Sequence, residues 1–177
     1  MVSQNIQDNR ERYLEIMHDH GLKERDAILV SVAETQAELL AVFESATEEQ
    51  ALREPAPDEW GLRDLAVHAV FTERLIAKII HHGARGTVPS AEDLAGAGIG
   101  MMPPEDNRPY AEVLEALRGT NADLLTSVRE LPDSPNMEMK MPHPFFGPLN
   151  CLEWAGFQRV HDLDHIQHAR RIIASVG

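Results

Sequence analysis

Residues 149–176 read LNCLEWAGFQRVHDLDHIQHARRIIASV, and they show the clearest helical pattern of the chain. Its large apolar side chains are mostly three or four residues apart, which places them on one face of an α-helix. They are Leu152, Trp154, Phe157, Val160, Leu163, Ile166 and Ile172. The spacing predicts one long helix that reaches almost to the end of the chain.

Three further segments show the same periodicity, over residues 24–45, 62–83 and 110–131. Pro55 and Pro57 interrupt the pattern after the first segment, and Pro132 ends the third, because proline cannot continue a helix interior. A shorter helix is predicted over residues 9–18 with Gly21 as its C-cap, and strands find little support.

The connection over residues 83–109 is rich in glycine and proline and poor in bulky side chains. Such length predicts a lid, a binding loop or a crossover between helices that are not up-down neighbours, with a mobile surface loop as the alternative. Together the segments predict an all-α fold, a four-helix bundle with long crossover connections and a short N-terminal helix. We expect one domain over residues 1–177, with residues 1–23 as an N-terminal extension.

The composition excludes several classes of protein. The 177 residues include 16 basic and 29 acidic side chains, and the resulting net charge of −13 disfavours binding to nucleic acid or to an anionic membrane. No stretch approaches the roughly 18 apolar residues that a membrane helix requires, and the N-terminus lacks the apolar core of a signal peptide. We therefore expect a cytoplasmic protein. The lone Cys151 cannot form an internal disulfide, and a buried structural thiol is its simplest interpretation.

The placement of three of the nine histidines points to a metal site. His161 and His165 are four residues apart on the last helix, so their rings share one face, as two ligands of one metal require. His68 lies mid-helix near the apolar face of the second long helix, where burial of an unpartnered imidazole costs about 1–3 kcal/mol. A satisfied core histidine is the alternative for His68, and a chance pair is the alternative for the other two.

Other kinds of site fail on this sequence. A di-iron bundle needs two Glu-x-x-His pairs, and the chain offers only Glu15 with His18. A zincin needs His-Glu-x-x-His, whereas residues 161–165 read HDLDH and lack the glutamate that would act as the base. The hydrolase elbow, the phosphate loop and the dinucleotide fingerprint are also missing from the sequence, so these chemistries have no support.

Two motifs carry a resemblance to a known family. Residues 58–65 read DEWGLRDL and lead into His68, and residues 147–154 lead into His161-x-x-x-His165. In these features the chain resembles the DinB-like, or YfiT-like, four-helix metalloproteins over most of its length. The resemblance implies a divalent metal, commonly zinc or nickel, held by His68, His161 and His165, with water in the remaining positions.

One position departs from the family pattern. Where the family often has glutamine three residues after the last ligand, this chain has His168, and Gln167 lies one position earlier. His165 and His168 also share a helix face and could act as the ligand pair instead. We prefer His161 with His165 as the ligand pair. His168 would then line the pocket or contact the ligands without binding the metal.

Five further side chains are predicted to lie around such a metal. Asp64 and Asp164 can orient imidazoles as hydrogen-bond acceptors, with exposed helix carboxylates as the alternative. Trp154 and Gln158 precede His161 on nearby faces of the helix and can line the pocket, although core packing is an equal interpretation for Trp154. His143 opens the segment HPFFGP, which is either a stiff lid over the pocket or an ordinary packed loop.

The resemblance implies an enzyme in which a metal-bound low-molecular-weight thiol or water acts on a small substrate, as a thiol S-transferase, an isomerase or a hydrolase. No catalytic side chain is predicted, because a metal-bound thiol or water loses its proton near neutral pH. The implied partners are a small-molecule substrate and a second copy of the chain in a homodimer. The alternatives are a non-catalytic metal- or small-molecule-binding dimer of a stress response, and a purely structural bundle.

Overall fold

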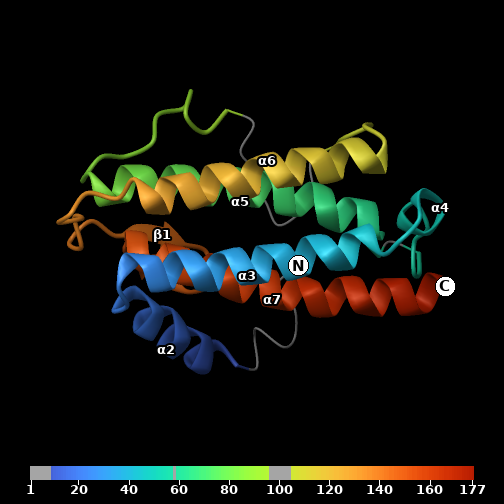
Figure 1. Cartoon of the computed structure of the whole chain (residues 1–177), viewed down its shortest axis with the longest axis horizontal. Helices are drawn as coiled ribbons and strands as arrows, with labels where there is room; N and C mark the ends of the chain where they lie inside the picture. The colour runs from blue at the N-terminus through green and yellow to red at the C-terminus, as the bar shows by residue number, and fades with distance from the viewer. Residues whose placement is uncertain (1–8, 58, 96–104) are drawn as a thin grey trace.

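The computed structural model describes residues 9–57, 59–95 and 105–177, and it has the predicted helical bundle (Figure 1). Four long helices form the bundle: α3 (Arg25–Glu44), α5 (Leu62–Ala84), α6 (Tyr110–Arg129) and α7 (Cys151–Val176). The helix α2 (Arg10–Gly21) precedes them. The single turn α4 (Glu48–Ala51) lies between α3 and α5, and the strands β1 (Met141–His143) and β2 (Gly147–Leu149) lie between α6 and α7. Within the described ranges, no helix is long and apolar enough to cross a bilayer. Asp58 of the predicted motif and residues 1–8 of the predicted extension lie outside the described residues.

The four long helices are arranged so that α3 and α5 each pack against both α6 and α7. Figure 1 shows that α3 and α7 run in one direction and that α5 and α6 run in the other. Because α5 and α6 are parallel neighbours, the connection between them must span the length of the bundle. The prediction of a crossover is therefore confirmed, and its middle, residues 96–104, lies outside the described residues.

The expectation that strands are absent is wrong for one short hairpin. β1 and β2 pair antiparallel just before α7, with Pro142 opposite Pro148. Each strand has only three residues, too few to produce an alternating pattern in the sequence. Gly147 has a φ of 86°, a backbone conformation that costs glycine less than other residues.

The last turn of α2 packs against the first turn of α7, and Gly21 lies at this contact. Gly21 is the last residue of α2 rather than a cap beyond it. A Cβ atom at this position would lie 3.4 Å from Cγ of Glu153, an ordinary van der Waals distance, so α2 packs against the start of α7 at this point. Glu153 belongs to the capping box of α7, in which Asn150 Oδ1 accepts hydrogen bonds from the backbone N–H groups of Leu152 and Glu153.

The apolar core is divided into two halves by buried polar side chains. One half contains the start of α7 and the end of α5, and the other contains the end of α7 and the start of α5. Between these halves each long helix contributes polar residues, which we call the central polar layer: Thr35, Gln36, Glu73, Thr120, Asn121, Gln158 and Asp162. All are buried except Asn121, which is half-buried. The sequence pattern did not predict this layer.

Candidate metal centre

His68 is held in the first half of α5 by apolar neighbours on both sides. Val67 and Ala69 are buried, while the His68 side chain is only partly buried. The indole of Trp60 packs against its ring, with the ring centroids 5.1 Å apart. Trp60 precedes α5 and is itself partly buried, so it covers one side of the imidazole.

His161 and His165 lie one turn apart on the buried face of α7. Their ring centroids are 4.0 Å apart, and both side chains are buried. The helical register places both rings toward α5, where each packs against the ring of His68, with centroid distances of 5.4 Å for His161 and 5.2 Å for His165. The structure thus brings together the three histidines that the sequence singled out.

The ring nitrogens of the three histidines are close enough to share one ion. One nitrogen from each of His68, His161 and His165 lies within 4.8 Å of the others, and His68 Nε2 is 3.3 Å from His161 Nε2. Tetrahedral zinc with Zn–N bonds of about 2.0–2.1 Å separates its ligand nitrogens by about 3.3–3.4 Å. The His68–His161 distance therefore matches one edge of such a tetrahedron.

The protonation state of the three rings also fits a metal. Burial lowers the pKa of His68 to about 4, and burial together with the neighbouring histidines lowers the pKa values of His161 and His165 well below the usual 6.5. All three are therefore neutral at pH 7, the form that coordinates a metal. His161 Nδ1 and both ring nitrogens of His165 are buried without a hydrogen-bond partner, and a metal would satisfy a nitrogen that is otherwise costly to bury.

His168 does not belong to this group in the described part of the chain. The histidines with converging nitrogens include His161 and not His168. The His168 side chain is partly buried, and burial lowers its pKa while the charge of Asp164 opposes that shift. Asp164 is buried, which excludes an exposed carboxylate at this position.

Two other predicted residues have structural partners that are not histidines. Asp64 is partly buried, and its Oδ2 accepts a hydrogen bond from the backbone N–H of Gly61 at 3.2 Å, which caps the start of α5. Gln158 donates from Nε2 to Glu73 and Asp162, so its described hydrogen bonds connect it to the central polar layer. Neither set of contacts reaches the three rings.

The segment before α7 packs beside the histidines as an aromatic cluster. Nδ1 of His143 accepts hydrogen bonds from the backbone N–H groups of Phe145 and Phe146, both at 3.1 Å, and burial lowers the pKa of His143 to about 4. Its ring lies 4.3 Å from that of Phe157, which in turn lies 5.4 Å from the ring of His161. Phe157 therefore stands between this segment and the histidines.

Trp154 and Cys151 are part of the core at the start of α7. Trp154 is buried and its Nε1 donates to the backbone carbonyl of Met141 at 3.3 Å, which ties the helix to the hairpin. Cys151 is buried beside Gly83, and burial raises the pKa of its thiol. Both residues lie more than one helical turn before His161, as the sequence predicts for Cys151.

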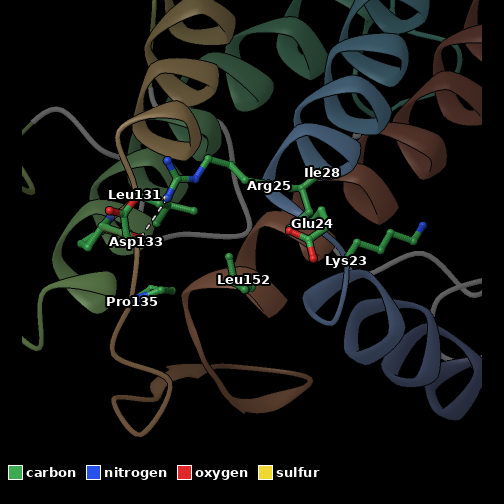
Figure 2. Close-up of a pocket in the computed structure, with 9 residues that line it drawn as sticks. Lys23, Glu24, Arg25, Ile28, Leu131, Asp133, Pro135 and Leu152 are labelled. Atoms are coloured by element: carbon green, nitrogen blue, oxygen red, sulfur yellow. Dashed lines mark hydrogen bonds and ion pairs between the residues drawn. The ribbon is translucent and has the colours of Figure 1, made fainter.

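A cavity of about 190 Å³ lies elsewhere, between the α2–α3 connection and the α6–α7 connection (Figure 2). Its wall combines apolar side chains with charged ones, and Arg25 reaches across it to Asp133 at 3.8 Å. None of the three clustered histidines lines it. The candidate centre therefore does not lie in this cavity.

The sequence did not predict Trp60 and Phe157 as neighbours of the centre, and of the central polar layer it singled out only Gln158. Trp60 stands in a recognised motif and Phe157 in the apolar stripe of the last helix, but nothing in one sequence shows which side chains a buried ring contacts. Gln158 and Asp162 carry a usable signal, because they are four residues apart on the same helix stripe as His161 and His165.

Comparison with known proteins agrees with this architecture. The sequence profile of the DinB superfamily matches residues 32–169. One solved structure, described as a four-helix bundle protein, superposes with a TM-score of 0.62 at 23% identity and covers 84% of this chain and 99% of its own. The mycothiol-dependent maleylpyruvate isomerase superposes with a TM-score of 0.64 at 12% identity, over 85% of this chain and 61% of the isomerase. A search of curated protein sequences gives no match.

Proposed function

Because this chain belongs to the DinB superfamily, we propose that it is a metal-dependent enzyme whose divalent ion is held by His68, His161 and His165. The observation that carries the proposal is the convergence of three neutral imidazoles from two helices within 4.8 Å. Three nitrogen ligands and a remaining open position form the donor set of a catalytic zinc site, and nickel is the second choice for such ligands.

The chemistry proposed is activation of a low-molecular-weight thiol or a water for attack on a small substrate. A bound divalent ion supplies this by lowering the pKa of the thiol or water toward neutrality. The chain's own residues contribute neutral ligands, because the rings are already deprotonated at pH 7, and an apolar wall, because Trp60 and Phe157 pack on the ligand rings. Transfer of the thiol, isomerisation and hydrolysis all begin with this attack, and the fold similarity to a mycothiol-dependent isomerase favours the thiol.

Metal content is the first test of the proposal. Wild type, reconstituted with zinc or nickel and desalted, should retain about one ion per chain, as three histidine ligands that share one ion imply. His68→Ala, His161→Ala and His165→Ala should each lose it. His168→Ala is the matched control on the same helix and should retain it. A wild type that binds no metal, or a loss confined to His168→Ala, would contradict the assignment.

Turnover is the second test, and it separates an enzyme from a binding protein. The reconstituted protein is assayed with a panel of low-molecular-weight thiols and small electrophiles, and with ester or amide substrates for hydrolysis. Activity that disappears on metal removal and returns with one ion supports the proposal. Stoichiometric metal without turnover in any assay would favour the non-catalytic binding module instead.

The small-molecule partners and the homodimer belong to the same proposal, as does a cytoplasmic location. Sedimentation analysis of the metal-loaded protein tests the dimer directly, because a monomer at all accessible concentrations would contradict it. The strongly negative charge of −13 remains the argument against a nucleic-acid partner.

A further inference from the structure

Thr72 of α5 places its hydroxyl against the candidate metal centre. Its Oγ1 lies 3.4 Å from Nε2 of His68, and the same nitrogen is 3.3 Å from Nε2 of His161. Thr72 follows His68 by four residues, so the two side chains share one face of α5. Nε2 of His68 is therefore the nitrogen that faces both a neighbouring histidine and the hydroxyl.

The direction of this hydroxyl is unusual for a threonine inside a helix. A helical threonine commonly donates to a backbone carbonyl three or four residues earlier. Thr35 and Thr120, which are buried, follow this rule, and each places Oγ1 3.0 Å from the carbonyl oxygen three residues before it. Among the hydrogen bonds of the described residues, Thr72 makes none to its own helix, and His68 is its only side-chain partner. Its hydroxyl is thus turned into the histidine cluster.

An ion on His68 would take this partner away. If Nε2 binds the metal, its lone pair is occupied and it carries no proton, so it can neither accept from the hydroxyl nor donate to it. Thr72 is partly buried, and a hydroxyl that loses its partner there needs another one. A small molecule bound at the open position of the ion can provide that partner.

The side of the cluster formed by α5 is also the less enclosed side. His161 and His165 are 7% and 8% exposed, whereas His68 and Thr72 are both partly exposed. A small molecule that reaches the three rings therefore meets the side chains of α5. Among the described hydrogen bonds and ring contacts of the three imidazoles, the hydroxyl of Thr72 is the only one.

A hydroxyl in this place favours an ionised molecule over a neutral one. Hydrogen bonds to charged groups are stronger than those between neutral groups. A small thiol that has lost its proton keeps lone pairs on its sulfur, and these can accept from the O–H of Thr72. The hydroxyl would therefore add to the preference of a divalent ion for the ionised thiol.

We propose that Thr72 binds and orients the small thiol at the metal centre by donating one hydrogen bond from Oγ1 to the ionised sulfur. This inference rests on the proposed function, because it requires an ion held by His68, His161 and His165. It adds a group from the chain itself that recognises the thiol. Thr72 is not a ligand of the ion, so its hydroxyl affects thiol binding and leaves metal binding as it is.

The test uses Co²⁺ as the probe ion and 2-mercaptoethanol as the probe thiol. The whole chain is loaded with Co²⁺, desalted and titrated with the thiol, and the absorption of the thiolate–cobalt bond reports binding. Thr72→Val has nearly the same shape as wild type but no hydroxyl. It should retain about one Co²⁺ per chain, as wild type does, and bind the thiol at least about tenfold more weakly, as expected for one hydrogen bond to a charged group. Thr72→Ser keeps the hydroxyl and should recover most of the affinity.

Two controls connect the signal to the centre and to the hydroxyl. Thr126→Val makes the same change at a partly buried threonine of α6 that has no described contact with the histidines, and it should alter neither Co²⁺ retention nor thiol affinity. His161→Ala should lose the ion, and the thiolate–cobalt absorption should disappear with it. Thr72→Ala also lacks the hydroxyl and replaces Thr72→Val in the comparison if the valine variant does not fold.

The possible failures are distinguishable. Equal thiol affinity of wild type and Thr72→Val, with Co²⁺ bound in both, would overturn the role of Thr72 and leave the metal assignment intact. Loss of Co²⁺ from Thr72→Val, or a Thr72→Ser variant as weak as Thr72→Val, would overturn it as well, because Thr72 would then act as a ligand or through packing. Wild type that binds Co²⁺ but no thiol would overturn both this role and the thiol as substrate. Wild type that retains no Co²⁺ would overturn the proposed metal centre itself, and this inference with it.

Discussion

The indole of Trp60 lies against the imidazole of His68, with 5.1 Å between the ring centroids. The other tryptophan of the chain, Trp154, is separated from the histidines by Phe157, which packs against both Trp154 and His161. The two indoles therefore lie at different distances from the candidate centre. One touches a proposed ligand directly, and the other reaches the centre only through an intervening ring.

This difference predicts how a quenching metal affects tryptophan fluorescence. Co²⁺ should quench Trp154→Phe, which retains only Trp60, more strongly than Trp60→Phe, which retains only Trp154, because quenching falls steeply with distance. Titration of both variants with Co²⁺ measures the effect. In a His161→Ala background the difference should vanish. Equal quenching of the two variants would mean that the ion binds away from His68.

The stability of the protein should depend on pH through His20. This side chain is buried with Nε2 2.5 Å from Oγ of Ser31, and burial lowers its pKa from 6.5 to about 4. Between these pH values the unfolded chain binds a proton at His20 that the folded chain does not, so this residue lowers the free energy of unfolding as the pH falls. In His20→Gln the free energy of unfolding should therefore depend less on pH, with a slope smaller by up to about 1.4 kcal/mol per pH unit.

Urea unfolding of wild type and His20→Gln at several pH values between 4 and 8 measures this slope. Near pH 8 almost no unfolded or folded wild type is protonated at His20, so the difference in stability between the two proteins should level off there. It should then change steadily as the pH falls from 6.5 to about 4. A difference that stays constant over the whole range would show that the buried ring is protonated as easily as an exposed one.

Two helical glycines should respond in opposite directions to alanine. A Cβ atom on Gly156 of α7 would lie 3.1 Å from Cα of Met17 and 3.1 Å from Cβ of His20, both in α2. Gly156→Ala should therefore destabilise the protein by about 1–3 kcal/mol, because backbone must move. Gly119 of α6 has no atom within 4 Å of such a Cβ, and Gly119→Ala should stabilise by about 0.5–1 kcal/mol.

Chemical denaturation of the two alanine variants gives both values. Because α2 lies outside the four-helix bundle, Gly156→Ala should retain zinc as well as wild type does. A stabilising Gly156→Ala would show that α2 does not pack against α7 as the structure describes.

The cap of α7 should contribute measurably to stability. Asn150 Oδ1 accepts from the backbone N–H groups of Leu152 at 3.0 Å and Glu153 at 2.9 Å, and Glu153 Oε2 accepts from the backbone N–H of Asn150 at 2.8 Å. Asn150→Ala removes the first two bonds and should cost about 1 kcal/mol. Thr47→Ala, which removes the similar cap of the single-turn α4, should cost less, because so short a helix supports little of the core. Thermal or urea unfolding of both variants provides the comparison.

The long helices and the three histidines were predictable because both follow the helical repeat. Apolar side chains mark the buried face of each helix. His161 and His165 are four residues apart and lie on that face of α7. His68 stood out by its position near the apolar face of the second long helix, the resemblance implied it as the third ligand, and the structure places its ring beside the other two. For residues 83–109, length and composition allowed a crossover as one of several interpretations, and the parallel directions of α5 and α6 select it (Figure 1).

Other features left no such pattern in the sequence. The hairpin of β1 and β2 is too short to alternate, and two of its six residues are prolines, which usually indicate loops. Glu73 and Asp162 belong to residue types that are almost never fully buried, so a periodicity argument assigns them to the surface. Only the packing of four helices shows that they face each other. The cap of α4 was recognisable, since Thr47 and Gln50 have the spacing of a capping box.

The bridge from Glu73 through Gln158 to Asp162 also has an evolutionary consequence. If Glu73 alone changed to an apolar residue, the amide of Gln158 would lose one of its two acceptors in the core, and a buried polar group left unsatisfied costs about 1–3 kcal/mol. Joint replacement of all three by well-packed apolar side chains carries no such penalty. Related sequences should therefore keep these three positions polar together or lose them together, and single losses should be rare.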